Sequence, residues 1–270
     1  SRTGGEEVGQ QSPAQEEKAL MRMRQYVCGL HAVRTLLTVR PGSVQEINVA
    51  DSRSDRRCAP VIELASAADV PVHILPRHEL DLLQPGVRHQ GVIASVDLPA
   101  EGLREQELKP FLDNLGMSPF LLVLDGVQDP HNLGACLRTA DAAGVHAVIV
   151  PRDRAAHLTP TVRKVASGAA ETVPLFSVTN LARSLRTLKE AGIWLYAASD
   201  NAEGVIFDAD LQGPVALVLG GEGKGLRRLT RELCDHQVAI PMAGQVESLN
   251  VSVAAGVLLY EAVRQRGRPG

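Results

Sequence analysis

Four short apolar runs constrain the fold of this chain more than any other feature. They occupy residues 120–124, 145–150, 193–197 and 215–219. Turn residues bound each run, and segments with helical periodicity lie between them. A strand that is apolar along its whole length must be covered on both faces, which is typical of a parallel sheet between two layers of helices. We therefore predict an α/β domain over residues 119–270, with a long amphipathic helix at 249–264.

A smaller α/β module is predicted over residues 24–97, because strand-like runs alternate there with helix-like segments. Its strands are expected at 44–49, 70–75 and 91–96, and its helices at 29–38, 57–68 and 77–83. Residues 98–118 carry many charges and two prolines, which predicts a linker with one helical piece. Residues 1–23 are expected to be a disordered extension rather than a signal peptide.

Composition and charge limit the classes of function. The net charge is −3, so a nucleic-acid binder of this composition needs a local basic surface. The four cysteines form no CxxC pair, which argues against zinc and for reduced thiols in the cytoplasm. No run approaches the roughly 18 apolar residues that a membrane span requires. We therefore expect a cytoplasmic protein without a metal site and without a membrane anchor.

Three turns follow apolar strands, at residues 125–138, 220–225 and 241–250. Ligands of parallel α/β sheets bind at the carboxyl ends of the strands. The second turn is not a phosphate-binding P-loop, because Gly225 and not Ser or Thr follows Lys224, and its glycines also miss the dinucleotide-binding spacing. A tight glycine turn that only reverses the chain is the alternative there.

The third turn carries Ser248, Leu249 and Asn250 at the start of a helix. Ser and Asn are common helix N-caps, which is the purely structural interpretation. An apolar side chain between polar ones also suits a pocket that binds the face and the edge of a base.

The residues of these turns follow three recurrent patterns. They are Asn132-x-Gly134-x-x-x-Arg138, Leu217-x-x-Gly220-x-Glu222-x-x-Gly225, and Ile240-Pro-Met followed by Ser248-Leu-Asn250. In this order they resemble the signature motifs of the SpoU (TrmH-like) branch of the SPOUT RNA ribose methyltransferases. The segments YVCGLHAV and RHQGVIASV of the N-terminal module resemble the L30e-like RNA-binding domain of one subgroup. Enzymes of that subgroup methylate a guanosine ribose in the peptidyl-transferase P loop of 23S rRNA.

The resemblance implies a SPOUT-type parallel sheet with a C-terminal trefoil knot, preceded by a small L30e-like α/β domain. It implies methyl transfer from S-adenosylmethionine to a ribose 2′-hydroxyl of 23S rRNA by a homodimer. The implied catalytic residues are Asn132, Arg138, Glu222, Ser248 and Asn250. The implied cofactor-binding residues are Leu219, Gly220, Ile240, Met242 and Leu249.

Chemistry restricts the role of Arg138. The 2′-hydroxyl is a weak nucleophile that must be activated and held in line with the methyl group. Because a guanidinium has a pKa above about 12, we expect Arg138 to stabilise negative charge on the oxygen rather than to act as the base. Glu222 is expected to orient Arg138, and Asn132 to hold a ribose or phosphate oxygen. A surface arginine on a helix is the alternative.

Candidate RNA contacts are basic residues of the N-terminal module. They are Arg53, Arg56, Arg57, Arg88 and His89. The helix at 249–264 and the helix after Asn132 are the expected dimer interface. A tRNA ribose methyltransferase, a resistance-type rRNA methylase and a non-catalytic RNA-binding ribosome-assembly protein are the alternative functions.

Overall fold

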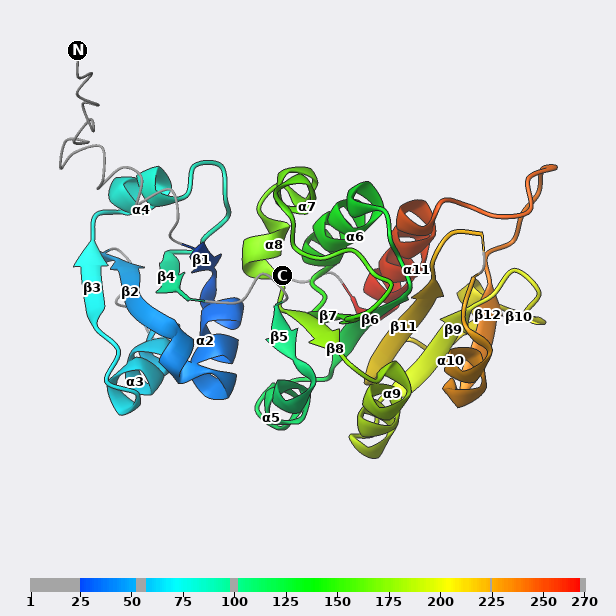
Figure 1. Ribbon diagram of the computed structural model, residues 1–270, viewed down its shortest axis with the longest axis horizontal. Helices are drawn as coiled ribbons and strands as arrows, with labels where there is room; N and C mark the ends of the chain where they lie inside the picture. Colours follow the sequence, from blue (N-terminus) through cyan, green and yellow to red (C-terminus); the bar gives the residue numbers. More distant parts are fainter. Residues whose placement is uncertain (1–24, 52–56, 98–101, 224, 268–270) are drawn as a thin grey trace, which may run out of the picture.

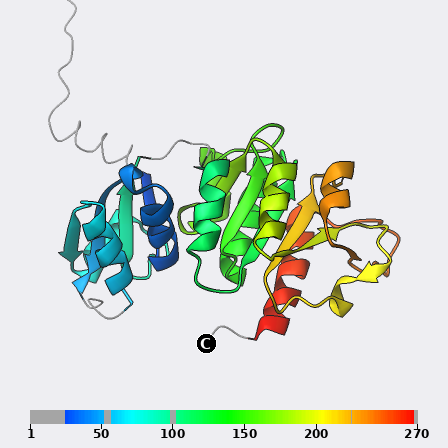
Figure 2. The same ribbon diagram turned by 90° about the horizontal axis from the view of Figure 1, so that it is seen from below.

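The computed structural model describes residues 25–51, 57–97, 102–223 and 225–267. The predictions for residues 1–23, and for Arg53 and Arg56, lie outside these ranges. The described chain forms two sheets that lie beside one another (Figure 1). The view from below separates the same two modules (Figure 2).

The N-terminal module is a four-stranded mixed sheet with helices. Its elements are β1 (Gln25–Cys28), α2 (Leu30–Val39), a 3-10 turn at Pro41–Ser43, β2 (Val44–Ala50), α3 (Ala59–Ala67), β3 (Val72–Leu75), α4 (Arg77–Leu83) and β4 (Val92–Val96). The strand order is β1-β4-β2-β3, with β4 antiparallel to both of its neighbours and β2 parallel to β3. All six predicted elements are present. The sequence interpretation omitted β1, which is too short to display a periodicity.

The larger sheet has eight strands, and all of their pairings are parallel. They are β5 (Leu103–Arg104), β6 (Phe120–Asp125), β7 (Ala147–Pro151), β8 (Leu175–Val178), β9 (Trp194–Ala198), β10 (Gly204–Val205), β11 (Val215–Gly220) and β12 (His236–Ala239). Their order is β10-β12-β9-β11-β6-β7-β8-β5. The four apolar runs of the sequence form β9, β11, β6 and β7, which are the central strands, so the predicted parallel sheet is confirmed.

Helices cover both faces of this sheet (Figure 1). They are α5 (Leu108–Asp113), α6 (Pro130–Ala143), α7 (Pro160–Ala166), α8 (Ala169–Thr172), α9 (Leu181–Glu190), α10 (Arg228–Leu233) and α11 (Val251–Arg266), with 3-10 turns at Glu105–Glu107 and Ile206–Asp208. Alternate residues of β6 enter different cores. Leu121 and Val123 pack with α5 and α9, whereas Leu122 and Leu124 pack with α6 and α11. This alternation is what a strand buried on both faces requires.

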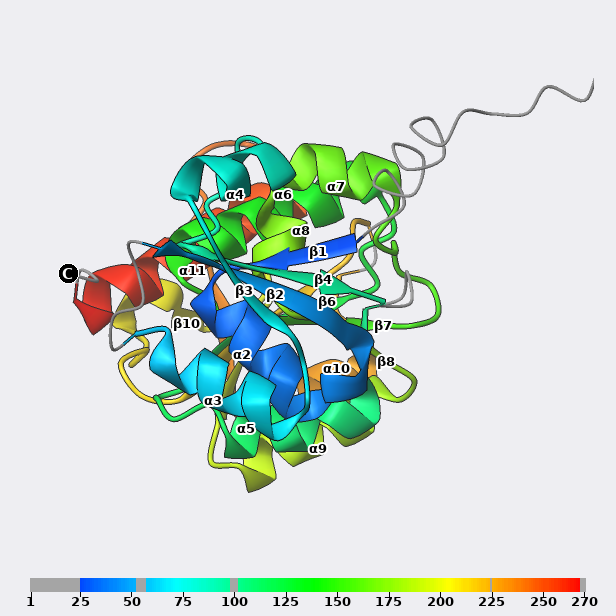
Figure 3. The same cartoon turned by 90° about the vertical axis from the view of Figure 1, so that its left-hand side faces the viewer.

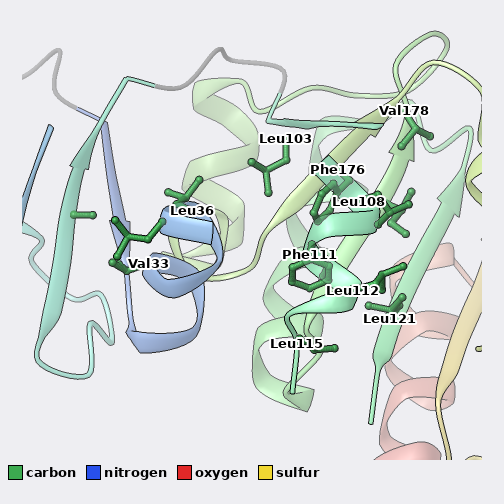
Figure 4. Close-up of a cluster of buried hydrophobic side chains, with 14 of the residues drawn as sticks. Val33, Leu36, Leu103, Leu108, Phe111, Leu112, Leu115, Leu121, Phe176 and Val178 are labelled. Atoms are coloured by element: carbon green, nitrogen blue, oxygen red, sulfur yellow. The ribbon is translucent and has the colours of Figure 1, made fainter. Parts of the chain in front are cut away.

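Residues 103–113, within the predicted linker, are packed structure. Strand β5 pairs with β8 at the edge of the large sheet. Leu108 and Phe111 are buried in one hydrophobic cluster with Val33 and Leu36 of α2 (Figure 4). The guanidinium of Arg34 also donates to the backbone oxygen of Leu115 at 3.1 Å. The two modules are therefore joined by a continuous apolar core, and the view from the side of the N-terminal module places α2 and α3 in front of it (Figure 3).

Candidate active site

A cavity of about 510 Å³ opens at the carboxyl ends of β9, β11 and β12. Its size is within the usual range of small-molecule sites, about 300–1,000 Å³. The structure brings eight of the predicted site residues to its wall. They are Leu219, Gly220, Glu222, Ile240, Met242, Ser248, Leu249 and Asn250.

Two glycines of the second turn allow backbones to meet at the edge of this cavity. A Cβ atom on Gly220 would lie 2.1 Å from the carbonyl carbon of Gly225, and one on Gly221 would lie 2.2 Å from the oxygen of Gly126. Both distances are far below a van der Waals contact, so no side chain fits at either position. The turn is therefore folded on itself and packed against the loop after β6. A turn that only reverses the chain would not need these close backbone contacts.

Three polar side chains join the three turns. The carboxylate of Glu222 accepts hydrogen bonds from the side-chain amides of Asn132 and Asn250. The amide of Asn250 also donates to the side-chain oxygen of Asn132 at 3.0 Å. Asn132 is 7% exposed, whereas Glu222 and Asn250 are exposed toward the cavity rim. One contact network thus contains a residue from each of the three sequence motifs.

Helix starts place two of these side chains. Asn250 is the N-cap of α11, where its side-chain oxygen accepts from the backbone nitrogen of Ser252 at 2.9 Å. Asp129 is the N-cap of α6 and accepts from the backbone nitrogen of His131 at 2.8 Å. An N-cap fixes the first turn of a helix, so Asn132, in that first turn, is held rigidly. The structural interpretation of Asn250 as an N-cap is therefore confirmed, and the same side chain also contacts Glu222 at the cavity.

Arg138 does not join this network. It lies six positions after Asn132 on α6, which is about 9 Å along the helix and about 240° around it. Its side chain is exposed and makes no hydrogen bond or ion pair with the described residues. The expected orientation of Arg138 by Glu222 is thus absent within one chain, because Glu222 is bound to two amides instead.

An ion pair that the sequence interpretation missed fixes the second turn. The buried carboxylate of Asp125, at the end of β6, accepts from Nε of Arg227 at 2.7 Å and from its backbone nitrogen at 3.3 Å. The backbone nitrogen of Gly221 also donates to the backbone oxygen of Asp125 at 2.9 Å. An aspartate at the end of an apolar strand was the available signal, but its partner lies 102 residues away.

Further polar groups of the cavity wall come from outside the motifs. Ser199, Asp200 and Asn201 follow β9, and Arg231 lies on α10. Nothing in the spacing of the sequence connects these residues to the signature turns.

Cys136 is buried on α6 close to the site. Burial, together with the charge of Glu222, raises the pKa of its thiol to about 12. The thiol is thus protonated at neutral pH and is no nucleophile. Among the described residues there is no group of three or more His, Cys, Asp or Glu side chains that could hold a metal ion. Within the same residues, no helix is long and apolar enough to cross a bilayer.

The candidate RNA contacts of the N-terminal module differ in exposure. Arg57 and Arg88 are exposed. His89 is only 2% exposed, and its Nδ1 accepts from the backbone nitrogen of Gly91 while its Nε2 lies 2.8 Å from a carboxylate oxygen of Asp81. The imidazole therefore holds the loop before β4, and burial withholds it from a phosphate. Arg88 is the candidate that this loop presents.

Comparison with known proteins gives both modules counterparts. A model of the SpoU rRNA Methylase family matches residues 119–260, and a model of RNA 2′-O ribose methyltransferase substrate binding matches residues 26–101. The 23S rRNA (guanosine-2′-O-)-methyltransferase RlmB of Pectobacterium atrosepticum is 54% identical, over 91% of this chain and 100% of that protein. RlmB of Escherichia coli K12 is 51% identical, over 90% of this chain and 100% of that protein.

A solved structure shares the architecture. The SpoU methyltransferase AviRb from Streptomyces viridochromogenes, in complex with the cofactor AdoMet, is 29% identical. The match has a TM-score of 0.56 and covers 92% of this chain and 93% of AviRb.

Proposed function

Because the chain belongs to the SpoU rRNA methylase family, we propose that it methylates the ribose 2′-hydroxyl of a guanosine in 23S rRNA with S-adenosylmethionine as methyl donor. The observation that carries this proposal is the network of Glu222, Asn132 and Asn250 at the rim of the 510 Å³ cavity. Full-length relatives at 51% and 54% identity act on 23S rRNA guanosine.

The residues of the cavity suit S-adenosylmethionine. Leu219, Ile240 and Leu249 offer apolar surface for an adenine, and the glycine turn offers backbone groups that no Cβ covers. Asp200 and Arg231 supply opposite charges, which fits a ligand with an ammonium and a carboxylate. When bound, the cofactor supplies an electrophilic methyl group on its sulfonium. The trefoil knot around it stays a prediction from the resemblance.

The chain's own residues must bring the acceptor hydroxyl to that methyl group. Glu222 uses one carboxylate oxygen for the two amides, and its second oxygen has no hydrogen bond within the described residues. We assign this oxygen and the hydroxyl of Ser248, both in the cavity wall, to the binding of the ribose. Positioning alone accounts for a large part of such a rate enhancement.

Arg138 enters the mechanism through a dimer. We propose that two copies pair through α6 and α11, since α11 packs on α6 and exposes Val253 and Tyr260 at 52% and 51%. That interface would cover the surface of α6 which carries Arg138, so its guanidinium would serve a site shared by two chains. There it stabilises the developing negative oxygen.

The resemblance to this family also supports more detailed proposals. We propose that the modified guanosine lies in the P loop and that the protein acts in the cytoplasm, where its rRNA is. Residues 24–97 recognise the RNA, and the catalytic module begins near residue 119. The alternatives are a tRNA or resistance-type methylase and a non-catalytic assembly factor. An intact cofactor cavity is an argument against the last of these.

Methyl transfer to a 23S rRNA transcript tests the proposal. The wild-type protein should incorporate methyl groups at a guanosine ribose, and Arg138→Ala should lose about 100- to 1,000-fold in rate, as the removal of one preorganised charge stabiliser does. Calorimetry should find unchanged cofactor binding in this variant. Transfer to tRNA alone, or binding of RNA without any transfer, would contradict the proposal.

A further inference from the structure

The position of the cofactor cavity in the sheet restricts the path of an RNA that also contacts the N-terminal module. Its wall consists of residues after β9, β11 and β12, which form one half of the sheet. Asn132 and Asp129 follow β6, next to that half. Beyond them lie β7, β8 and the N-terminal module (Figure 1). An RNA that reaches both the cavity and the N-terminal module must therefore cross the β7 side of the sheet.

The loop after β7 is attached to the loop of the first motif. The backbone nitrogen of Ala156 donates to the oxygen of Val127 at 2.9 Å. The oxygen of Arg154 lies 3.9 Å from the Cβ position of Gly126. Arg154 is exposed and has a left-handed backbone, with φ at 61°. Non-glycine residues in that region are uncommon, and they concentrate at functional sites. The backbone of this loop thus lies against the loop after β6, and the loop carries an exposed arginine.

Helix α7 continues in the same direction. It packs on α6 so closely that a Cβ on Gly134 would lie 2.7 Å from the Cβ of Val165. Lys164 of α7 is exposed and makes no ion pair within the described chain. Its neighbour Arg163 is bound to Glu171 at 2.6 Å, so Lys164 is the free cation of this helix.

The end of α7 touches the N-terminal module. The side chain of Val87 lies 3.2 Å from the Cβ position of Gly168, which follows α7. Arg88 is the next residue, and it is exposed without an ion-pair partner in the described residues. Figures 1 and 3 both place α4, α7 and α8 on the same side of the molecule.

The acidic residues near these three cations have partners of their own. Asp81, close to Arg88, lies 2.8 Å from Nε2 of His89. The nearest in sequence is Asp153, which lies 3.5 Å from Arg152 and is paired with it. Glu171 is paired with Arg163. In a chain with a net charge of −3, a run of unpaired cations is a local feature that attracts phosphates.

We propose that Arg154, Lys164 and Arg88 form a phosphate track along which the acceptor RNA runs from the active site to the N-terminal module. The proposal rests on the proposed function for the identity of the RNA. The track fixes the direction of the strand and carries no base recognition, because phosphate contacts position a nucleic acid without specifying its sequence.

Salt-dependent binding of a 23S rRNA transcript to the full chain tests the track. The variants are Arg154→Asn, Lys164→Gln, Arg88→Gln and the triple combination; asparagine is chosen because it tolerates the left-handed backbone. The matched control is Arg186→Gln on α9, an exposed and unpaired arginine on the opposite face of the sheet. Dissociation constants are measured at several salt concentrations, and cofactor binding is measured by calorimetry.

Each single variant should bind RNA more weakly and lower the slope of log affinity against log salt by about 1, and the triple variant by about 2 to 3. The control slope and cofactor affinity should match the wild type. Wild-type slopes in all track variants would overturn the track while the methyltransferase assignment stands. Loss of cofactor binding in the variants would also count against it, whereas a wild-type protein that does not modify 23S rRNA would overturn the proposed function itself.

Discussion

Glu222 illustrates how much of the site can be read residue by residue. Because parallel strands end at one edge of a sheet, polar residues after successive apolar runs were expected to meet there. Asn132, Glu222 and Asn250 do meet. Their hydrogen bonds could not be predicted, since they depend on how far each loop reaches. For the same reason, the expected contact between Glu222 and Arg138 was wrong within one chain. Arg138 lies on another face of α6 than Asn132.

The Asp125–Arg227 pair yields the prediction at this scale. Arg227→Gln would leave a buried carboxylate without its guanidinium and loosen the turn that carries Glu222. We expect cofactor affinity to fall by about tenfold, or about 1.4 kcal/mol, with partial recovery in Arg227→Lys. Calorimetry measures both. Arg228→Gln is the control, because its partner Glu232 is half exposed at the surface. Equal loss in the control would exclude a positioning role for Asp125.

At the scale of elements, length decided what the sequence could predict. The central strands β6, β7, β9 and β11 could be predicted because a run of five or six apolar residues rarely occurs by chance. The edge strands β5 and β10 have two residues each, so they carry no periodicity and exist only because a neighbour pairs with them. Helix α5 was expected as a helical piece, but not its burial against α2, which is a tertiary contact.

Two helical glycines give opposite predictions. Gly134→Ala would drive a methyl group to 2.7 Å from Val165 and should destabilise the fold by about 1–3 kcal/mol. Gly256→Ala meets only Thr139, at 3.8 Å, and should stabilise α11 by up to about 1 kcal/mol, because alanine favours a helix. Urea denaturation measures both free energies of unfolding. Similar values for the two variants would mean that α6 and α7 can separate without cost.

At the scale of the whole molecule, the exposed side of α11 is the first test. Val253→Glu with Tyr260→Glu should convert the proposed dimer into a monomer, since charge at the centre of an apolar interface is costly. Light scattering gives the mass. Leu229→Glu on α10 is the control, because Leu229 is equally exposed, at 52%, on the other face of the sheet. A wild-type monomer at micromolar concentration would refute the dimer.

The junction between the modules provides a test through pH. His31 of α2 lies 3.3 Å, through Nε2, from the backbone oxygen of His146, and the two rings are 5.5 Å apart. Burial, together with the nearby charges of His31 and Arg266, lowers the pKa of His146 to about 4. Burial also lowers the pKa of His31, against the hydrogen bond to His146, which raises it. Both imidazoles are thus neutral in the packed junction.

The sign of the effect follows from linkage. An exposed histidine takes up its proton near pH 6.5, whereas His146 in the folded chain does so only near pH 4, so the unfolded or undocked state binds more protons between these values. Stability should therefore be complete above about pH 6.5 and fall as the pH decreases toward 4. Thermal denaturation between pH 7.5 and 5.5 stays above the titration of ordinary carboxylates. His31→Gln, which keeps a donor for the oxygen of His146, should flatten part of this decline, and His31→Gln with His146→Gln most of it. If both variants lose stability as steeply as the wild type, then the histidines do not sense acid and the apolar core of Val33, Leu36 and Phe111 alone governs the docking of the two modules.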